Sequence, residues 1–200
     1  MRRGPGRPPN LEPSAAFLAR REMIVDTAIA VFSERGFDQG TLDDVALSLG
    51  TSRGSLYHYV PSKAHLLFLI FDRAIGTTLD RMAELSMVED PVARLEGLIA
   101  QQVRVIAENQ SMFLVFFGDR PALEERYESV IRAKERRLLR YLIEAVAEVQ
   151  RVGRLPPGDP RQVAQAILGM TSWFHKWFEP DRDDPDGYAR ICQALILGSH

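Results

Sequence analysis

Cysteine is almost absent from this chain, with a single residue, Cys192, among 200. One thiol excludes a disulfide framework within the chain and any Cys-rich metal site, and this usage favours a reducing cytoplasm. The four histidines, at positions 58, 65, 175 and 200, show no metal-ligand spacing. We therefore expect neither a structural metal nor a disulfide.

Long apolar runs are also missing, so no membrane-spanning helix is expected. The N-terminal arginines are not followed by an apolar stretch, which argues against a signal peptide. The hydrophobic content of 46% nevertheless predicts a packed core. The net charge of −2 alone argues against a nucleic-acid binder, but residues 1–21 hold five arginines against one glutamate, a local net charge of +4.

No set of residues typical of an enzyme is present. The chain has no Gly-rich phosphate loop after a strand, no serine nucleophile elbow and no strand-like alternation of apolar residues. Its many carboxylates fall in helix caps and on helix surfaces. We predict that the protein is not an enzyme and uses no cofactor.

Apolar residues recur at helical spacing through most of the chain, which predicts an all-α fold of about nine helices. Residues 1–13, rich in Arg, Gly and Pro, are expected to form a disordered basic arm, either a solvated tail or a contact to DNA. The expected helices, placed by their caps, Pro pairs and terminal glycines, are 14–35, 41–49, 53–59, 62–86, 91–108, 110–118, 121–152, 160–178 and 185–197.

Residues 41–60 have the pattern of a helix-turn-helix. Thr41 is a good N-cap, and two aspartates follow it in the first turn. Gly50 ends the first helix, and Ser52 caps the second. Two short helices joined by a turn that contains Gly are typical of DNA readers.

The second of these helices has the side chains of a reader. Leu56 should face inward, and the donors and rings of Arg53, Ser55, Tyr57, His58 and Tyr59 should face outward, with Gly54 allowing close approach. No acidic residue lies between Thr51 and Val60, which suits a surface that approaches phosphates. Lys63 lies in the first turn of the next helix, where the helix dipole is unfavourable to a cation. A DNA phosphate bound by Lys63 and the exposed N–H groups would explain this position.

The stretch from about residue 23 to 71 resembles the DNA-binding domain of the tetracycline-repressor (TetR) family of bacterial transcription regulators. It contains A-x-x-x-F-x-x-x-G-F, T-L-x-D-V-A, G-x-L-Y-x-Y and P-S-K at the spacing of that family. Val60 departs from the pattern, because the family more often has Phe there. The resemblance implies that Tyr57, Tyr59 and Lys63 hold the DNA backbone, whereas Arg53, Ser55 and His58 suit base edges. The full predicted DNA-binding set is Thr41, Ser52, Arg53, Gly54, Ser55, Tyr57, His58, Tyr59 and Lys63.

The resemblance also implies a division of the chain and its partners. Residues 14–61 would form the helix-turn-helix domain, and residues 62–200 an effector-binding and dimerisation domain. The last two helices are apolar enough for a self-complementary four-helix contact between two subunits, which is where the family forms dimers. Such a homodimer would bind double-stranded DNA at an inverted-repeat operator.

The effector is the least determined partner. Three phenylalanines within residues 110–118 fit either a core helix or the wall of an apolar cavity, and the charged stretch RAKERRLLR fits a solvated face or phosphate binding by Arg136 or Arg137. The ending W-x-x-x-W-F-x-P is similar to that of family regulators of lipid and steroid catabolism, some of which respond to acyl-coenzyme A (acyl-CoA) thioesters. The candidate ligand-binding residues are Phe113, Phe116, Phe117, Arg120, Trp173 and Lys176.

Two alternatives remain open at this point. A multidrug-type regulator would sense aromatic or cationic compounds, and it would have buried unpaired acids in its cavity. Exposed basic residues at the mouth would instead favour coenzyme A. In a different class, an all-helical binding module without a DNA function would show the same helix caps, but it would not need an acid-free reader or Lys63.

Overall fold

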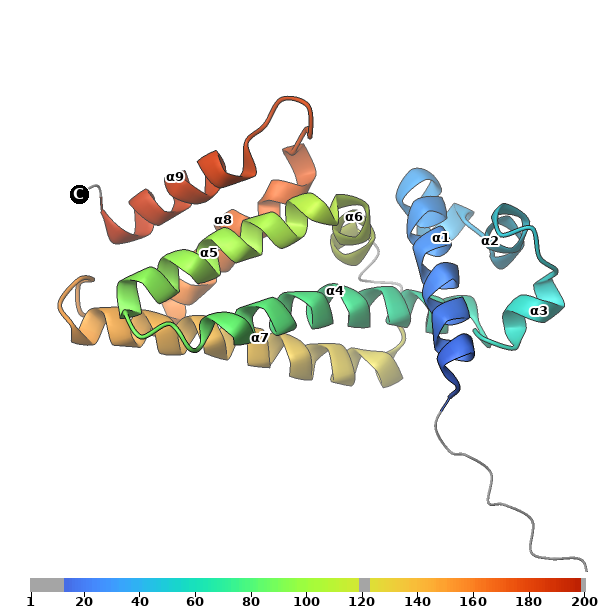
Figure 1. Cartoon of the computed structure of the whole chain (residues 1–200), viewed down its shortest axis with the longest axis horizontal. Coiled ribbons are helices and arrows are strands. Elements are labelled where there is room, and N and C mark those ends of the chain that lie inside the picture. Colours follow the sequence, from blue (N-terminus) through green and yellow to red (C-terminus); the bar gives the residue numbers. More distant parts are fainter. Residues whose placement is uncertain (1–12, 119–122, 199–200) are drawn as a thin grey trace, which may run out of the picture.

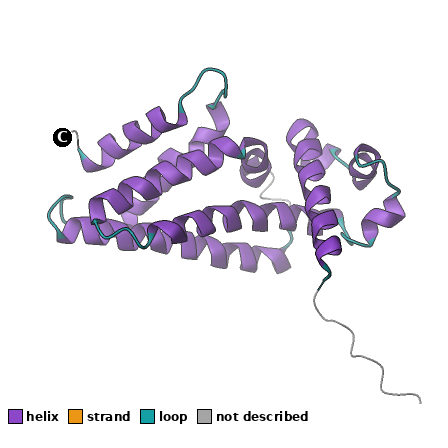
Figure 2. Cartoon of the chain, viewed as in Figure 1, coloured by secondary structure: helices purple, strands orange, loops and turns teal. Residues whose placement is uncertain are grey.

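The computed structural model describes residues 13–118 and 123–198, which form nine α-helices and no strand (Figures 1 and 2). This confirms the expected all-helical class. The predicted basic arm, except Pro13, and Arg120 lie outside the described residues. The helices are α1 (Ala15–Gln39), α2 (Leu42–Ser48), α3 (Arg53–Tyr57), α4 (Lys63–Leu85), α5 (Pro91–Glu108), α6 (Gln110–Gly118), α7 (Glu125–Arg151), α8 (Pro160–Trp177) and α9 (Pro185–Leu197).

Helix α1 supports the N-terminal part. Ser14 caps its start: the Ser14 Oγ accepts a hydrogen bond from the backbone N–H of Phe17 at 3.2 Å. The sequence predicted its end at Gly36; the chain instead kinks there, with φ of +76°, and continues to Gln39. Glycine adopts this φ without the steric penalty of a Cβ. The kink brings Phe37 against Phe32, with ring centroids 5.4 Å apart, which closes the core beneath α2 and α3.

The C-terminal part is a bundle around α4 and α5. Helix α4 follows the helix-turn-helix and packs along α7 and α5 (Figure 1). Helix α8 packs on α5 and α7, and α9 packs on α5. The largest fully buried side chains of this bundle include Leu66, Leu67, Ile70, Phe71, Met82, Leu95, Leu98, Ile99 and Phe174. None of the helices in the described ranges is long and apolar enough to cross a membrane.

Two contacts join α1, in the N-terminal part, to the bundle. Helix α6 packs directly against α1, beside which it lies in Figure 1. Arg73 of α4 forms ion pairs with Glu22 and Asp26, both on α1. Both α4 and α6 therefore contact α1, which packs on α2 of the helix-turn-helix.

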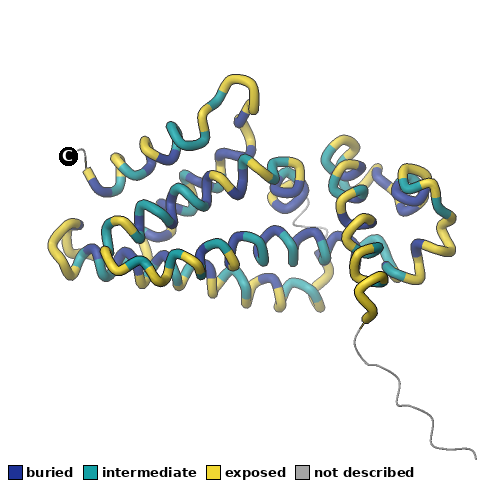
Figure 3. Tube along the Cα trace, in the orientation of Figure 1, coloured by how far each residue is buried: buried dark blue, intermediate teal, exposed yellow. Residues whose placement is uncertain are grey.

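A row of large apolar side chains remains exposed on α8 and α9. Trp173 is 62% exposed, Ile191 57% and Leu195 70%, and Trp177 is also exposed. The four-residue spacing within each helix puts Trp173 with Trp177, and Ile191 with Leu195, on one side of its helix. Figure 3 shows that exposed positions recur along α9 on the side opposite its buried residues. We call these four side chains the α8–α9 face.

Candidate DNA-binding surface and effector cavity

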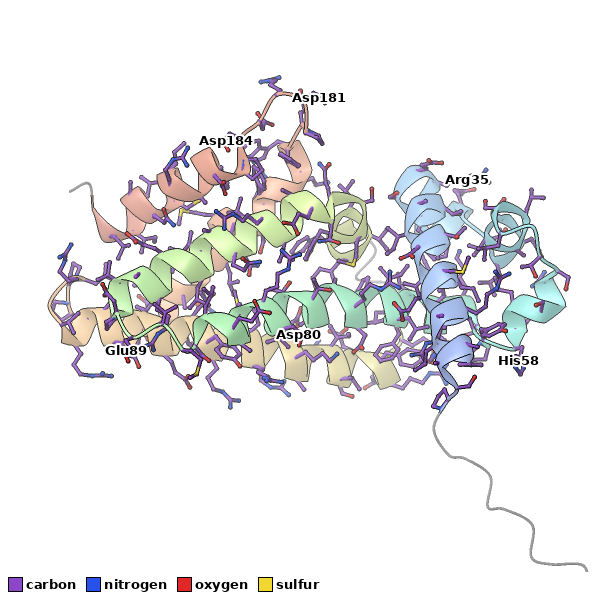
Figure 4. The ribbon with its side chains drawn as sticks, in the orientation of Figure 1. Arg35, His58, Asp80, Glu89, Asp181 and Asp184 are labelled. Carbon is purple, nitrogen blue, oxygen red and sulfur yellow. The ribbon has the colours of Figure 1, made fainter. Side chains whose placement is uncertain are left out.

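The first helix of the helix-turn-helix is fixed by its cap. The Thr41 hydroxyl oxygen accepts from the backbone N–H of Asp44 at 3.1 Å, and the Asp44 carboxylate accepts from the backbone N–H of Thr41 at 2.9 Å. Hydrogen bonds from Thr41 first, and then the Arg35 guanidinium at 2.7 Å, lower the pKa of Asp44. Arg35, labelled in Figure 4, belongs to α1, so this cap also ties α2 to α1.

The turn and the second helix follow the predicted pattern, although the helix is shorter. Gly50 has φ of +61°, and the Ser52 side chain caps α3 by accepting from the N–H of Ser55 at 3.2 Å. Helix α3 ends at Tyr57 and not at Tyr59, because the N–H of Tyr59 bonds to the Leu56 carbonyl three residues back. This tighter turn buries Val60 completely.

The outward side of α3 is open to solvent. Arg53, Gly54, Ser55, Tyr57 and His58 are exposed, whereas Leu56 is buried, as expected. Figure 3 shows α3 as a mostly exposed segment at one end of the molecule, and Figure 4 shows His58 projecting there. Tyr59 differs from the others: it is half-buried, with its ring 4.9 Å from that of Phe17 in α1.

Arg53 is held in place before any DNA arrives. Its Nη2 and Nε donate to the phenol oxygen of Tyr57 at 2.9 and 3.2 Å, and its Nη1 donates to Asp43 at 2.8 Å. The Tyr57 hydrogen bonds first, and then the charge of Asp43, raise the pKa of Arg53. No local pattern indicated Asp43 in this role, because it lies ten positions away on α2. A carboxylate therefore borders the reader, although α3 itself has none.

Lys63 lies against the end of α1. Its ammonium is 4.2 Å from the centre of the Phe37 ring and donates to the backbone carbonyl of Asp38 at 3.3 Å. The ring face and the carbonyl stabilise a cation in the first turn of α4, where the helix dipole opposes it. Lys63 remains half-buried at the start of α4.

Replacing Lys63 by methionine, which keeps the contact with Phe37 but removes the charge, should weaken binding to operator and scrambled DNA by a similar factor. If Lys63 contacts a phosphate, the slope of log affinity against log salt should fall by about 1 per subunit. Fluorescence anisotropy titrations from low to moderate salt measure both. An unchanged slope would show that Lys63 only packs on α1; Lys134→Met, remote from the reader on α7, is the control.

A cavity lies inside the bundle, between α4, α5, α6, α7 and α8. Its volume is about 490 Å³. It is lined by Ile75, Thr78, Gln102, Phe113, Phe116, Phe117, Arg132, Glu135, Arg136, Leu138, Leu139, Leu168 and Ser172. All three predicted phenylalanines of α6 therefore line one cavity, together with leucines of α7 and α8.

The polar residues that line the cavity fall into a buried group and an exposed group. Thr78 and Gln102 are buried in the interior, whereas Arg132 and Arg136 are exposed on α7. Arg132 pairs with Glu128 at 2.7 Å, one turn earlier on the same helix. Of the two arginines considered for phosphate binding, Arg136 lines the cavity and Arg137 does not. The sequence did not indicate Thr78 or Gln102, because nothing local marks a buried polar residue as facing a cavity.

Trp173 and Lys176, which the sequence predicts as ligand-binding residues, are not among the described residues that line this cavity, and their role stays a prediction. Ser172 faces the cavity, and each following residue is rotated by about 100° around the helix. Trp173, the next residue, is exposed on another side of α8, whereas Lys176, four residues after Ser172, returns to within about 40° of it and is exposed one turn further along the helix.

Comparison with known proteins agrees with this architecture. A family model described as the tetracycline repressor-like C-terminal domain matches residues 88–199, and one described as bacterial regulatory proteins of the tetR family matches residues 24–70. The HTH-type transcriptional repressor KstR2 of Mycolicibacterium smegmatis is 24% identical over 190 residues, which cover 90% of each chain.

Two solved structures share the fold over most of the chain. The TetR-family regulator PfmR of Thermus thermophilus superposes with a TM-score of 0.83 at 26% identity, covering 87% of this chain and 96% of that one. AibR, solved with isovaleryl coenzyme A and operator DNA, has a TM-score of 0.83 at 22% identity, covering 90% of this chain and all of that one. Since the C-terminal family model alone spans more than half of the residues, the chain belongs to the TetR family of DNA-binding transcription regulators.

Proposed function

We propose that the protein is a repressor that binds an inverted-repeat operator as a homodimer and leaves it when an acyl-CoA thioester occupies the cavity. DNA-binding regulation itself follows from the family; the operator symmetry, the dimer contact and the effector are proposals. The observation that carries the effector proposal is the lining of the cavity, which combines an apolar interior with exposed guanidinium groups.

On DNA, α3 would enter the major groove. Arg53, Ser55 and His58 point to solvent and would contact base edges, with Arg53 suited to guanine by its two parallel donors. Tyr57, Tyr59 and Lys63 would hold the backbone, beside Thr41 and Ser52 at the two helix starts and Gly54 at the closest approach. We retain residues 14–61 as the reader domain and residues 62–200 as the effector-binding and dimerisation domain.

The dimer would form through the α8–α9 face. Four large apolar side chains exposed on two neighbouring helices are unusual for a surface that stays in water. A two-fold axis would place the same face of a second copy against them and complete a four-helix contact. The two reader helices would then be related by the same axis, which is why an inverted repeat is expected.

The cavity favours a thioester of coenzyme A over a cationic drug. Glu135 is the one carboxylate among the described lining residues, and it already has an interaction within the protein. The exposed lining instead holds Arg132 and Arg136, which suit the phosphates of coenzyme A. AibR, which has the same fold, was solved with isovaleryl coenzyme A. The apolar interior would take the acyl group.

The route from cavity to DNA would use α6 as well as α4. Phe113, Phe116 and Phe117 line the cavity from α6, and α6 packs on α1. Phe116 also contacts Phe71 of α4, with ring centroids 4.8 Å apart. A ligand that displaces these rings would shift α1 and α4 together and so change the spacing of the two readers. The ligand causes release of DNA only if it binds the DNA-free conformation of the protein more tightly than the DNA-bound conformation.

The test is operator release by defined ligands. The full chain is titrated onto the DNA that flanks its own gene, and acyl-CoA thioesters of increasing acyl length, coenzyme A alone, free fatty acids and a cationic dye are added. A differential affinity of about 2.7 kcal/mol would weaken DNA binding roughly 100-fold. Release by the thioesters alone supports the proposal. Release by the dye alone, or by none of these ligands, contradicts it.

A further inference from the structure

Gln102 is a buried polar side chain whose hydrogen bonds are unmet. It lies on α5, is 5% exposed and lines the cavity. Three other polar side chains are buried in the described part of the chain: Thr78, Thr171 and His175. Each of those interacts with a backbone carbonyl of its own helix, at Ala74, Ile167 and Ser172 respectively. Gln102 makes no hydrogen bond with any described residue, and its Oε1 is shielded from solvent.

An unpaired carboxamide in an apolar wall destabilises a protein, so a buried polar group without a partner requires a reason. Half of the residues that share the cavity wall with Gln102 are phenylalanines and leucines, which offer it neither donor nor acceptor, and none of the polar ones is hydrogen-bonded to it. A plain hydrocarbon chain in this cavity would leave the carboxamide unpaired. A ligand with an oxygen at this place would pair it.

We propose that the effector carries a hydroxyl or keto oxygen on its apolar part, and that the Gln102 carboxamide recognises this oxygen by a hydrogen bond. A carboxamide accepts from a hydroxyl through its oxygen and donates to a ketone through its nitrogen, so one side chain serves both forms. Thr78 lines the same cavity from α4, and its hydroxyl proton is directed to the Ala74 carbonyl. The Thr78 oxygen can therefore also accept from a ligand hydroxyl.

The inference rests on the proposed function in one respect, the position of the oxygen along the ligand. Arg132 and Arg136 are exposed, whereas Gln102 and Thr78 are buried. If Arg132 and Arg136 bind the coenzyme A phosphates, the thioester lies towards the exposed side of the cavity. The opposite end of the acyl group then reaches Gln102 and Thr78 in the interior. The effector class is then an acyl-CoA thioester whose acyl group is oxygenated at the end remote from the thioester.

The test compares matched ligands on matched proteins. The wild-type full chain, Gln102→Leu and Gln101→Leu are titrated calorimetrically with octanoyl-coenzyme A, 8-hydroxyoctanoyl-coenzyme A and 7-oxooctanoyl-coenzyme A. Gln101 is adjacent on α5 and is not part of the cavity lining, which makes it the control. The wild type and Gln101→Leu should bind an oxygenated thioester about tenfold or more tightly than octanoyl-coenzyme A.

Gln102→Leu should lose this preference and bind octanoyl-coenzyme A at least as tightly as the wild type does. If the substitution only damaged the cavity, the variant would bind all three thioesters more weakly. Circular dichroism and thermal unfolding would then detect a loss of folded structure. Gln102→Asn then serves as the second variant, with a partial preference expected. Equal affinity of the wild type for all three thioesters, or an unchanged preference in Gln102→Leu, would overturn the inference and leave the thioester proposal standing.

If no thioester binds the wild type, the thioester proposal fails, and the role of Gln102 is decided with probes that lack coenzyme A. Cyclohexanol, cyclohexanone and cyclohexane are then compared by ligand-observed NMR on the same three proteins. A preference for the oxygenated rings that disappears only in Gln102→Leu supports the polar anchor. Equal binding of the three rings rejects it.

Discussion

Replacing Arg53 by alanine is expected to weaken specific operator binding by roughly 30-fold to 10⁴-fold while leaving the fold intact. Loss of a base-reading arginine costs about 1–3 kcal/mol per base position, and a symmetric dimer loses it twice. The structure supports a large effect, because Tyr57 and Asp43 already hold the guanidinium in one orientation. Little side-chain freedom then remains to be lost on binding.

The measurement is a competition assay with the operator, single-base variants of it and scrambled DNA. Arg53→Ala should lose affinity for the operator and discriminate less at one base position of each half-site, with little change on scrambled DNA. Arg53→Lys keeps the charge without the two parallel donors, and it should behave like alanine in discrimination. Arg182→Ala, exposed in the loop before α9, is the control. Equal losses on operator and scrambled DNA would make Arg53 a phosphate contact.

Introducing charge into the α8–α9 face should convert the protein to a folded monomer that no longer binds its operator. In Ile191→Asp/Leu195→Arg, two exposed apolar side chains of α9 are removed. Burial of each of these side chains stabilises a dimer by about 1.5–3 kcal/mol. Because of the two-fold symmetry, each residue contributes from both subunits. The new charges would also be buried in any residual contact. A single reader then makes half of the contacts and falls towards non-specific affinity.

Sedimentation equilibrium determines the mass, circular dichroism the helix content, and anisotropy the operator affinity. The expected combination is a halved mass, unchanged helicity and a loss of operator binding of more than about 100-fold. Val130→Arg places a charge at an exposed apolar position of α7 outside the proposed contact, and it should remain a dimer. A wild type that sediments as a monomer, or a double variant that still dimerises, would remove the α8–α9 face from the proposal.

Local sequence determined most of the helix boundaries in this protein. The start of α5 at Pro91 and that of α8 at Pro160 follow from Asp-Pro pairs, in which the aspartate caps and the proline supplies the fixed φ of a first turn. Thr41 and Ser52 fix α2 and α3 in the same way, through hydrogen bonds that span three residues. Such contacts depend on neighbours in the sequence, so the pattern predicts them without knowledge of the fold.

Tertiary packing decided what the side chains face. The ion pair of Arg53 with Asp43 joins two helices, and the cavity that Gln102 lines is bounded by five helices. The chemistry of Trp173 suits a ligand slot, yet the rotation of α8 in the bundle directs this side chain outward. Helical periodicity defines the sides of a helix relative to one another, but only its packing against other helices determines which side faces core, cavity or solvent.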